Sequence, residues 1–189
     1  ETDGNTATDL TGATLTGAKL SKADLSGANL AKNGSAVANL TNADLTGAIL
    51  TDTILSEANL TGANLTKANL TGANLTSTIL TGANLTGADL TGATLTNVVI
   101  SATTNLTSAI LVGADLGADD LTGVDLEKAD LRGADLAGTD LENAILTGAN
   151  LGKNGTTATD LTGATLTGAK LGKADLSGAN LAKNGSAVA

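Results

Sequence analysis

Leucine recurs every five residues along the stretch 58–75, which reads ANLTGANLTKANLTGANL. On an α-helix five residues turn the chain by roughly 500°, so these leucines would spiral around all sides of the helix. In a flat strand an odd spacing would send alternate leucines to opposite faces. The period therefore excludes both a regular amphipathic helix and a regular half-buried strand.

A tube built from short extended segments satisfies the spacing. Ala63 and Leu65 are two residues apart, so in an extended triplet they point the same way while Asn64 points the opposite way. If Thr66 with Gly62 or Lys67 forms a corner, each Ala-Asn-Leu unit becomes one wall with Ala and Leu inside. Glycine suits such a corner because it accepts a positive φ at no steric cost. The pattern predicts an all-β fold, a β-solenoid.

The composition fits a thin tube. The 189 residues include no Phe, Trp, Tyr, Met, Cys, His or Pro, and a tube one leucine deep does not need the aromatic residues that fill a globular core. Disorder, the main alternative for so biased a composition, is disfavoured by the regular leucine period.

Without Cys or His the chain cannot form disulfides, a Ser-His-Asp triad or a His-ligated zinc site. A net charge of −9 disfavours binding to nucleic acid or anionic lipid, and no apolar run approaches the ~20 residues of a membrane span.

The five-residue register covers nearly the whole chain. It comprises 37 pentads, of which 33 have Leu or Ile at the centre. Ile100 and Leu106 are six residues apart, so one residue near Thr103 is extra. We interpret it as a one-residue bulge at a corner, with a kink or ligand notch as the alternative.

The repeated A-(D/N)-L-(T/S)-G motif resembles the pentapeptide-repeat family over essentially the whole chain. The resemblance implies a right-handed quadrilateral β-helix with four pentads per coil, whereas the residues alone leave three-sided and four-sided coils open. Residues 1–189 would then form a single continuous solenoid of about nine coils. Two features depart from the family: no pentad centre is Phe, and the terminal helix or dimerisation segment of its gyrase-interacting members is missing.

The sequence also contains a longer repeat, which is made of many pentads. Residues 6–38 and 157–189 agree at 32 of 33 positions, with an offset of 151, and differ only at Ser21 and Gly172. The chain therefore ends within a repeat unit, which we interpret as a segment of a tandem array or a subunit that continues the pattern end to end. A recent local duplication is the alternative. Neither terminal stretch resembles a solenoid cap, which favours head-to-tail stacking.

Six outward positions, each just before a pentad centre, carry apolar residues in place of the usual polar ones. They are Ile49, Ile54, Ile79, Val99, Ile110 and Ile145. With four pentads per coil, Ile79 and Val99 stack on one face, and Ile49 and Ile110 fall on the opposite face. We predict lateral contacts between rods at these positions, although scattered exposed apolar residues also occur without any function.

Acidic residues are concentrated in the segment from Asp115 to Glu142. This segment contains nine of the nineteen acidic residues of the chain. Stacked carboxylates there could bind Ca²⁺, but the ligand set is sparse and Lys128 and Arg132 offset the charge. We therefore favour a solvated acidic face and predict no metal site and no cofactor. Asp119 occupies an inward position, where we expect local distortion.

Asn-X-Ser/Thr sites arise automatically from the repeat as Asn-Leu-Thr, so most carry little information. At Asn33, Asn154 and Asn184 the sequence is Asn-Gly-Ser/Thr and the pentad centre is polar. We expect these pentads to bulge outward and to be the most accessible sites if glycosylation occurs.

These features favour a structural protein over an enzyme, since no catalytic constellation is present and nothing marks a cleft. The expected partner is the protein itself, in a homopolymer formed by end-to-end and lateral packing, with no nucleic acid and no membrane insertion. The expected place is outside the cell or on its surface. The alternative is an acidic DNA mimic that acts on a type II topoisomerase in the cytoplasm, which the family resemblance implies. Ice binding by threonine is a weaker idea because Thr lies at corners on every side.

Overall fold

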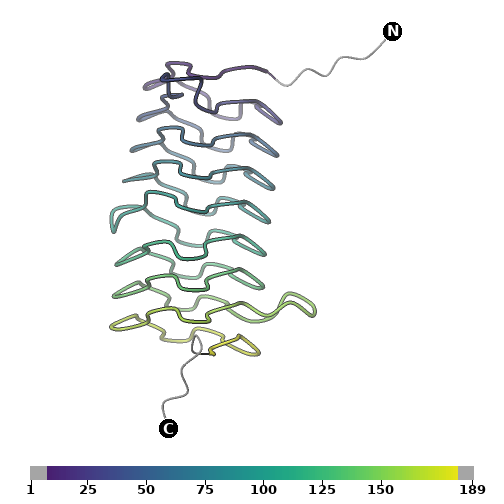
Figure 1. The fold of residues 1–189 in the computed structure, drawn as a ribbon, viewed down its shortest axis with the longest axis vertical. Coiled ribbons are helices and arrows are strands. Elements are labelled where there is room, and N and C mark those ends of the chain that lie inside the picture. The colour runs from purple at the N-terminus through teal and green to yellow at the C-terminus, as the bar shows by residue number, and fades with distance from the viewer. Residues whose placement is uncertain (1–7, 183–189) are drawn as a thin grey trace.

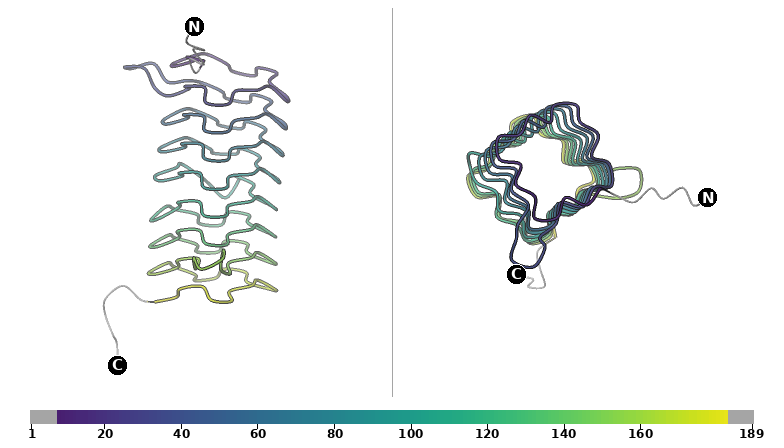
Figure 2. Two further views of the ribbon diagram at one scale, coloured as in Figure 1. Left: turned by 90° about the vertical axis from the view of Figure 1, so that its right-hand side faces the viewer. Right: turned by 90° about the horizontal axis from the view of Figure 1, so that it is seen from above.

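The computed structural model describes residues 8–182, which wind into a coil that stacks level on level along one axis (Figure 1). Viewed along that axis the coil is a square (Figure 2). Residues 8–182 contain no α-helix, and their walls are short extended segments, most of which form a β-bridge with the next level at the outward residue. No helix in this range could cross a membrane. That the chain is a single domain throughout its length stays a prediction.

Outward residues stack in four rows, and the pairs in each row define one face of the rod. In the regular part of the wall, paired residues such as Asn64 and Asn84 are 20 apart in sequence and run parallel. Four pentads therefore complete one coil, as the family resemblance implied.

The four faces are named here by the residues that pair along them. Face A contains Asp9, Asn29, Ile54, Asn74, Thr94, Asp115, Asp135, Asp160 and Asn180. Face B contains Thr14, Asn39, Asn59, Ile79 and Val99, followed by Asp120, Asp140 and Thr165. Face C contains Lys19, Asp44, Asn64, Asn84, Asn105, Asp125, Ile145 and Lys170. Face D contains Asp24, Ile49, Asn69, Asp89, Ile110, Asp130, Asn150 and Asp175. Faces A and C are opposite each other, as are faces B and D, because the chain visits the four in order.

Backbone hydrogen bonds join each wall to both of its neighbours. The N–H of Asn69 donates to the carbonyl of Ala48 in the preceding coil (2.9 Å), and the N–H of Leu70 donates to that of Asp89 in the following coil (2.6 Å). A turn closes each corner, for example from the Ala73 N–H to the Leu70 carbonyl (2.9 Å). The extended triplet thus satisfies its polar groups through stacking, which is why single coils of this kind need neighbours.

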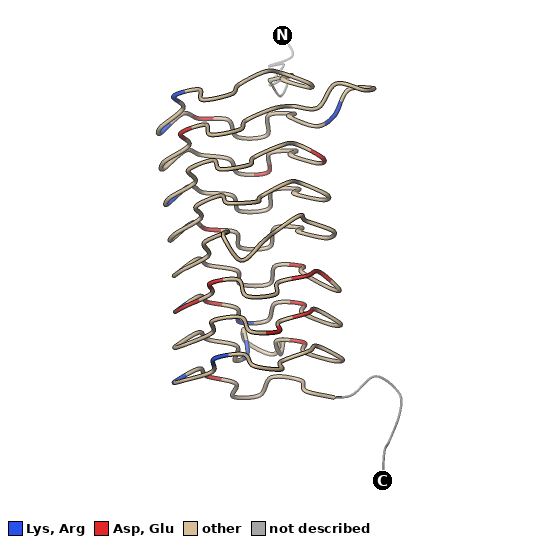
Figure 3. Cartoon of the chain, turned by 90° about the vertical axis from the view of Figure 1, so that its left-hand side faces the viewer, with Lys and Arg blue, Asp and Glu red and all other residues tan. Residues whose placement is uncertain are grey.

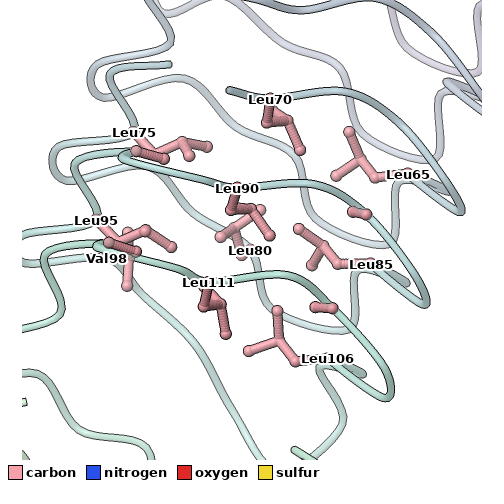
Figure 4. Close-up of a cluster of buried hydrophobic side chains, with 14 of the residues drawn as sticks. Leu65, Leu70, Leu75, Leu80, Leu85, Leu90, Leu95, Val98, Leu106 and Leu111 are labelled. Atoms are coloured by element: carbon pink, nitrogen blue, oxygen red, sulfur yellow. The ribbon is translucent and has the colours of Figure 1, made fainter. Parts of the chain in front are cut away.

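Leucine and alanine fill the interior, as the pattern predicted. Leu65, Leu70 and Leu75 are completely buried, and their side chains stack over those of the next coil (Figure 4). Burial of one leucine contributes on the order of 1.5–3 kcal/mol. The repeated contact between coils is therefore the main source of stability in the rod.

The second residue of most corner turns has a positive φ. Glycine commonly occupies this position, for instance Gly62 at 66°, but Lys67 adopts the same conformation at 56°. The Lys67 side chain extends over the next coil, where a Cβ added to Gly87 would lie 3.7 Å from its Cγ. Glycine at a corner accepts the positive φ at no steric cost, and at Gly62 the absent Cβ also leaves room for the Asn42 side chain of the preceding coil.

Two pentads with polar centres leave the wall and form small hairpins. Asn33 pairs antiparallel with Ala36, and Asn154 pairs antiparallel with Thr157. The offset between stacked residues rises from 20 to 25 across each hairpin, as in Lys19 with Asp44. Both hairpins project from corners of the square (Figure 2). The centres, Ser35 and Thr156, are exposed, which avoids burying an unpaired hydroxyl among leucines.

The extra residue predicted near Thr103 lies at Ser101, on the wall side of the corner. The Ser101 carbonyl accepts the turn hydrogen bond from the Thr104 N–H (2.8 Å). At regular corners the acceptor of this bond is the carbonyl of the central leucine. Ile100 is left only partly buried. Within residues 8–182, Ile79 pairs with Val99 and Asp120 pairs with Asp140, but no bridge joins Val99 to Asp120. The bulge therefore interrupts the ladder on face B, which the sequence did not reveal.

Candidate functional surfaces

The six predicted lateral-contact residues are spread over all four faces. Ile54 lies on face A and Ile145 on face C. Ile79 and Val99 stack on face B, while Ile49 and Ile110 lie on face D with two polar residues between them. The predicted stacking and the predicted opposite placement thus agree with the pairing. Only Ile79 and Val99 form a continuous apolar step, and Val99 is 48% exposed.

Outward asparagines and aspartates shape the corner that follows them. The Asn69 Oδ1 atom accepts hydrogen bonds from the Thr71 N–H (3.0 Å) and the Thr71 hydroxyl (2.7 Å). Asn64 bonds Thr66 in the same way. Each Asn-Leu-Thr triplet in the wall is therefore a local turn motif in which Asn and Thr are both engaged. This role explains the many Asn-X-Thr matches without reference to glycosylation.

The hairpin asparagines differ from those of the wall. Asn33 and Asn154 are exposed, and they lie beside the two-residue tips that project from the rod. Their backbones are held by pairing with Ala36 and Thr157, with N–H to carbonyl distances of 2.8 Å from each asparagine. Asn184 lies outside the described residues. Accessibility thus fits the prediction for Asn33 and Asn154, and modification itself stays a prediction.

Inward threonines form a feature that the sequence reasoning missed. The Thr78 hydroxyl donates to the Leu55 carbonyl of the preceding coil (2.7 Å), and the Thr139 hydroxyl donates to that of Leu116 (2.9 Å). Both residues are completely buried. The signal was available, because threonine replaces alanine at the inward position of these pentads. A donor at this position strengthens contact with the preceding coil.

The outward aspartates of the 115–142 segment are distributed over all four faces, and Figure 3 shows acidic positions in the lower half of the rod. Asp115 stacks with Asp135 on face A, and Asp120 stacks with Asp140 on face B, as predicted. No group of three or more carboxylates suited to a metal occurs among the described residues. The Thr122 hydroxyl and N–H lower the pKa of Asp120, so this carboxylate remains charged near neutral pH.

Basic residues neutralise part of the segment. The Arg132 guanidinium bonds both oxygens of Asp130, with its Nη2 atom 2.6 Å from Oδ2, and lowers the pKa of that carboxyl. Lys128 pairs with Glu127 at 2.8 Å. Exposed pairs of this kind contribute little stability. Together with the separation of the carboxylates, they describe a solvated acidic surface.

Asp119 is the one strongly perturbed carboxyl group in the described chain. It is 4% exposed, and its Oδ2 atom has no hydrogen-bond partner there. Burial raises the pKa of Asp119 to about 7, and the charge of Asp115 adds to the rise, while the backbone N–H of Asn97 opposes it. Asp119 immediately precedes Asp120, the residue that has no bridge to Val99 in the preceding coil. The bulge at Ser101 accounts for that interruption, and distortion caused by Asp119 itself stays a prediction.

The interior is partly exposed at the two described ends of the rod. Leu10, Leu15, Leu20 and Leu25 in the first coil are partly buried, as are Leu166, Leu171 and Leu176 in the last. Leu181 is 56% exposed, whereas mid-rod leucines such as Leu70 are completely covered.

Comparison with known families gives a match along most of the chain. Residues 6–32, 38–76, 68–101, 120–152 and 159–184 match the family described as pentapeptide repeats, in eight copies. A comparison with curated protein sequences gives no match.

Among solved structures, one similar protein is HetL from the cyanobacterium Nostoc, a pentapeptide repeat protein involved in heterocyst differentiation regulation. It is 38% identical over 94% of this chain and 88% of its own, with a TM-score of 0.47. Another is the trypsin-treated form of QnrB1, a plasmid-mediated fluoroquinolone resistance protein. It is 21% identical over 89% of this chain and 85% of its own, with a TM-score of 0.58. The second likeness supports the fold.

Proposed function

Because the chain belongs to the pentapeptide repeat family, we propose that it is a structural, non-catalytic protein that associates with further copies of itself. In this proposal the right-handed, four-sided rod of about nine coils joins end to end, and rods also pack side by side. The product is a filament, sheath or matrix layer outside the cell. The observation that carries the proposal is that residues 157–182, in the last described coil, repeat residues 6–31 of the first coil except at Gly172.

Stacking of one rod on another would repeat a contact that the chain already makes. Residues 157–182 match residues 6–31 except at Gly172. In the rod, the coil that contains Asp9 to Asn29 is covered on its downstream side by the coil that begins at Asn39. The downstream surface of the last described coil is thus chemically the same surface, and a coil of this fold fits it.

The energies predict association that depends strongly on concentration. Four leucines at each described end are partly exposed, and covering them would contribute on the order of 4–8 kcal/mol. Loss of translational and rotational freedom costs on the order of 4–15 kcal/mol. The backbone ladder adds about 0.5–1.5 kcal/mol for each hydrogen bond formed. We therefore expect assembly that depends on protein concentration, and the test covers the range from about micromolar to millimolar protein.

Sedimentation velocity and negative-stain microscopy over this concentration range test the proposal. The expected result is a shift to long, thin particles as the concentration rises. Replacing Leu171 and Leu181 with lysine should reduce the shift, because a charge would then lie in the stacking surface. The matched control replaces Asn69 and Asn84 with lysine, which adds the same charge at two outward wall positions. Isolated short rods at every concentration, or equal assembly of the leucine variant and the control, would contradict the proposal.

An acidic DNA mimic that acts on a type II topoisomerase is the second candidate, favoured by the stacked aspartates of the 115–142 segment. Duplex DNA carries one charge per about 1.7 Å, whereas a net charge of −9 spread over nine levels is about one per 4.8 Å. The average charge density is thus about a third of that of DNA. Inhibition of gyrase supercoiling at low micromolar protein would support this candidate, which places the protein in the cytoplasm. Cell fractionation separates the two locations.

A further inference from the structure

The 151-residue repeat and the four-sided coil have different natural periods. The repeat contains thirty pentads and one extra residue, and thirty is not a multiple of four. If every pentad formed a wall, the next unit would begin half a turn away from the first. Equivalent residues would then lie on opposite faces of the rod.

The structure shows that equivalent residues nevertheless share a face. Asp9 and Asp160 both lie on face A, and Lys19 and Lys170 both lie on face C. On face D the same holds for Asp24 and Asp175. Along face C the parallel pairs run without interruption from Lys19 to Lys170 in seven steps.

Three local irregularities account for this agreement. The hairpins at Asn33 and Asn154 each remove one pentad from the wall, and the bulge at Ser101 absorbs the one extra residue without adding a wall. Thirty pentads less two leave 28 walls, which make seven coils of four. If only one of the two hairpins formed, the count would be 29 walls, and the residues after the missing hairpin would move to the adjacent face.

We infer that the 151-residue repeat is an axial unit of seven whole coils, and that the two hairpins and the bulge are register devices that keep its surface on the same faces. With a spacing of about 4.8 Å between levels, equivalent residues lie about 34 Å apart along the axis. Successive units present straight rows of identical sites.

A surface of this kind fits a partner with the same axial period. The partner supported here is a second copy of the rod, and this part rests on the proposed self-association. A neighbouring copy that contacts one unit through a given face meets the same side chains again one unit further along that face. The seven-coil register itself is a property of the single chain and can be tested without assembly.

Cysteine pairs report which residues are stacked, because the chain has no cysteine of its own. The hairpin at Asn33 requires that Lys19→Cys stack with Asp44→Cys, and the hairpin at Asn154 requires that Ile145→Cys stack with Lys170→Cys. The pair Asn64→Cys with Asn84→Cys, 20 residues apart in the regular wall, sets the reference rate. Stacked Cα atoms at the strand spacing lie within the range that a disulfide bridges.

Both hairpin-spanning pairs should oxidise within about twofold of the reference rate, measured by mass spectrometry at dilutions where the protein is monomeric. Rates more than tenfold below the reference, for either pair, would overturn the seven-coil unit. The proposed self-association would not be affected by that result. Conversely, a protein that never assembles can still show the expected pairing.

Matched deletions test the role of the hairpins as register devices. Deleting residues 33–37 leaves Leu30-Ala31-Lys32-Ala38, an ordinary corner, so Lys19→Cys should still react with Asp44→Cys. Deleting residues 63–67, of equal length, restores the same local sequence but removes a wall. Asn59→Cys should then stop reacting with Ile79→Cys and react with Asn84→Cys. Loss of the first pairing, or retention of the Asn59–Ile79 pairing, would show that the hairpin pentads are not outside the coil count.

Discussion

Replacing Asp119 with threonine should remove a pH dependence from the stability of the rod. Thr139, the next inward residue on the same face, and Thr78 bury their hydroxyls by donating to leucine carbonyls of the preceding coils. Asp119 instead buries a carboxyl with one unpartnered oxygen. An ionised carboxylate cannot donate to a carbonyl, so threonine suits this position better at neutral pH.

The direction and size of the effect follow from the pKa. The carboxyl has an ordinary pKa of 3.8 when unfolded and a pKa of about 7 in the fold, so the folded state holds its proton more tightly. Folding carries no penalty from this group below about pH 4, and stability is lost as the pH rises toward 7. Because a tenfold change in proton affinity corresponds to about 1.4 kcal/mol, the loss between pH 5 and pH 8 is about 2 to 3 kcal/mol.

Urea unfolding followed by far-ultraviolet circular dichroism at pH 5 and pH 8 measures this loss, since the chain has no Trp or Tyr for fluorescence. The wild-type protein should lose stability at pH 8, and Asp119→Thr should keep it. Carboxyls with a lowered pKa, such as that of Asp120, stay ionised throughout this window and do not mask the effect. Asp120→Asn is therefore the control and should behave as the wild type. An unchanged pH dependence in Asp119→Thr would refute the reasoning.

Other substitutions test the wall, the surface and the hairpins. Leu70→Ala should cost about 2–5 kcal/mol in the same urea assay, because the completely buried side chain leaves a cavity. Asn69→Ala should cost about 1 kcal/mol through loss of the two bonds from Thr71; no change would show that the corner forms without them. Ile79→Asp with Val99→Asp should reduce lateral bundling in electron micrographs, and bundling as in the wild type would exclude a contact at this step. In a glycosylating host, peptide mass spectrometry should find sugar at Asn33 and not at Asn69.

The regular part of the fold could be predicted from sequence because one period governs it. A five-residue spacing of leucine, with alanine two places before each, determines which side chains face inward at Leu65 and equally at Leu70. The extrusion around Ser35 and Thr156 was also predictable, since a polar centre cannot replace a buried leucine. The distribution of Ile49, Ile79 and Ile110 over opposite faces followed from the four-sided count.

The irregular part depended on interactions that no period describes. The position of the extra residue was predicted at the corner near Thr103, but the Ser101 carbonyl takes over the turn hydrogen bond and moves the bulge onto the wall. The interrupted ladder beside Asp119 follows from that exchange of partners. The effect of each hairpin on the coil count also required the pairing itself, because a pentad outside the wall and a pentad within it have the same length.

The corner side chain that extends over the following coil makes certain positions interdependent. The Lys67 side chain lies over Gly87, and the Lys22 side chain lies over Gly47. A Cβ introduced at Gly87 would make an ordinary contact with Lys67, whereas one at Gly62 would meet the Asn42 Oδ1 atom, which would have to move. The effect of a substitution at such a corner should therefore depend on the side chain of the corner one coil earlier. For mutational scanning, the neighbours that determine the tolerance of a corner lie one coil away, not beside it in the sequence.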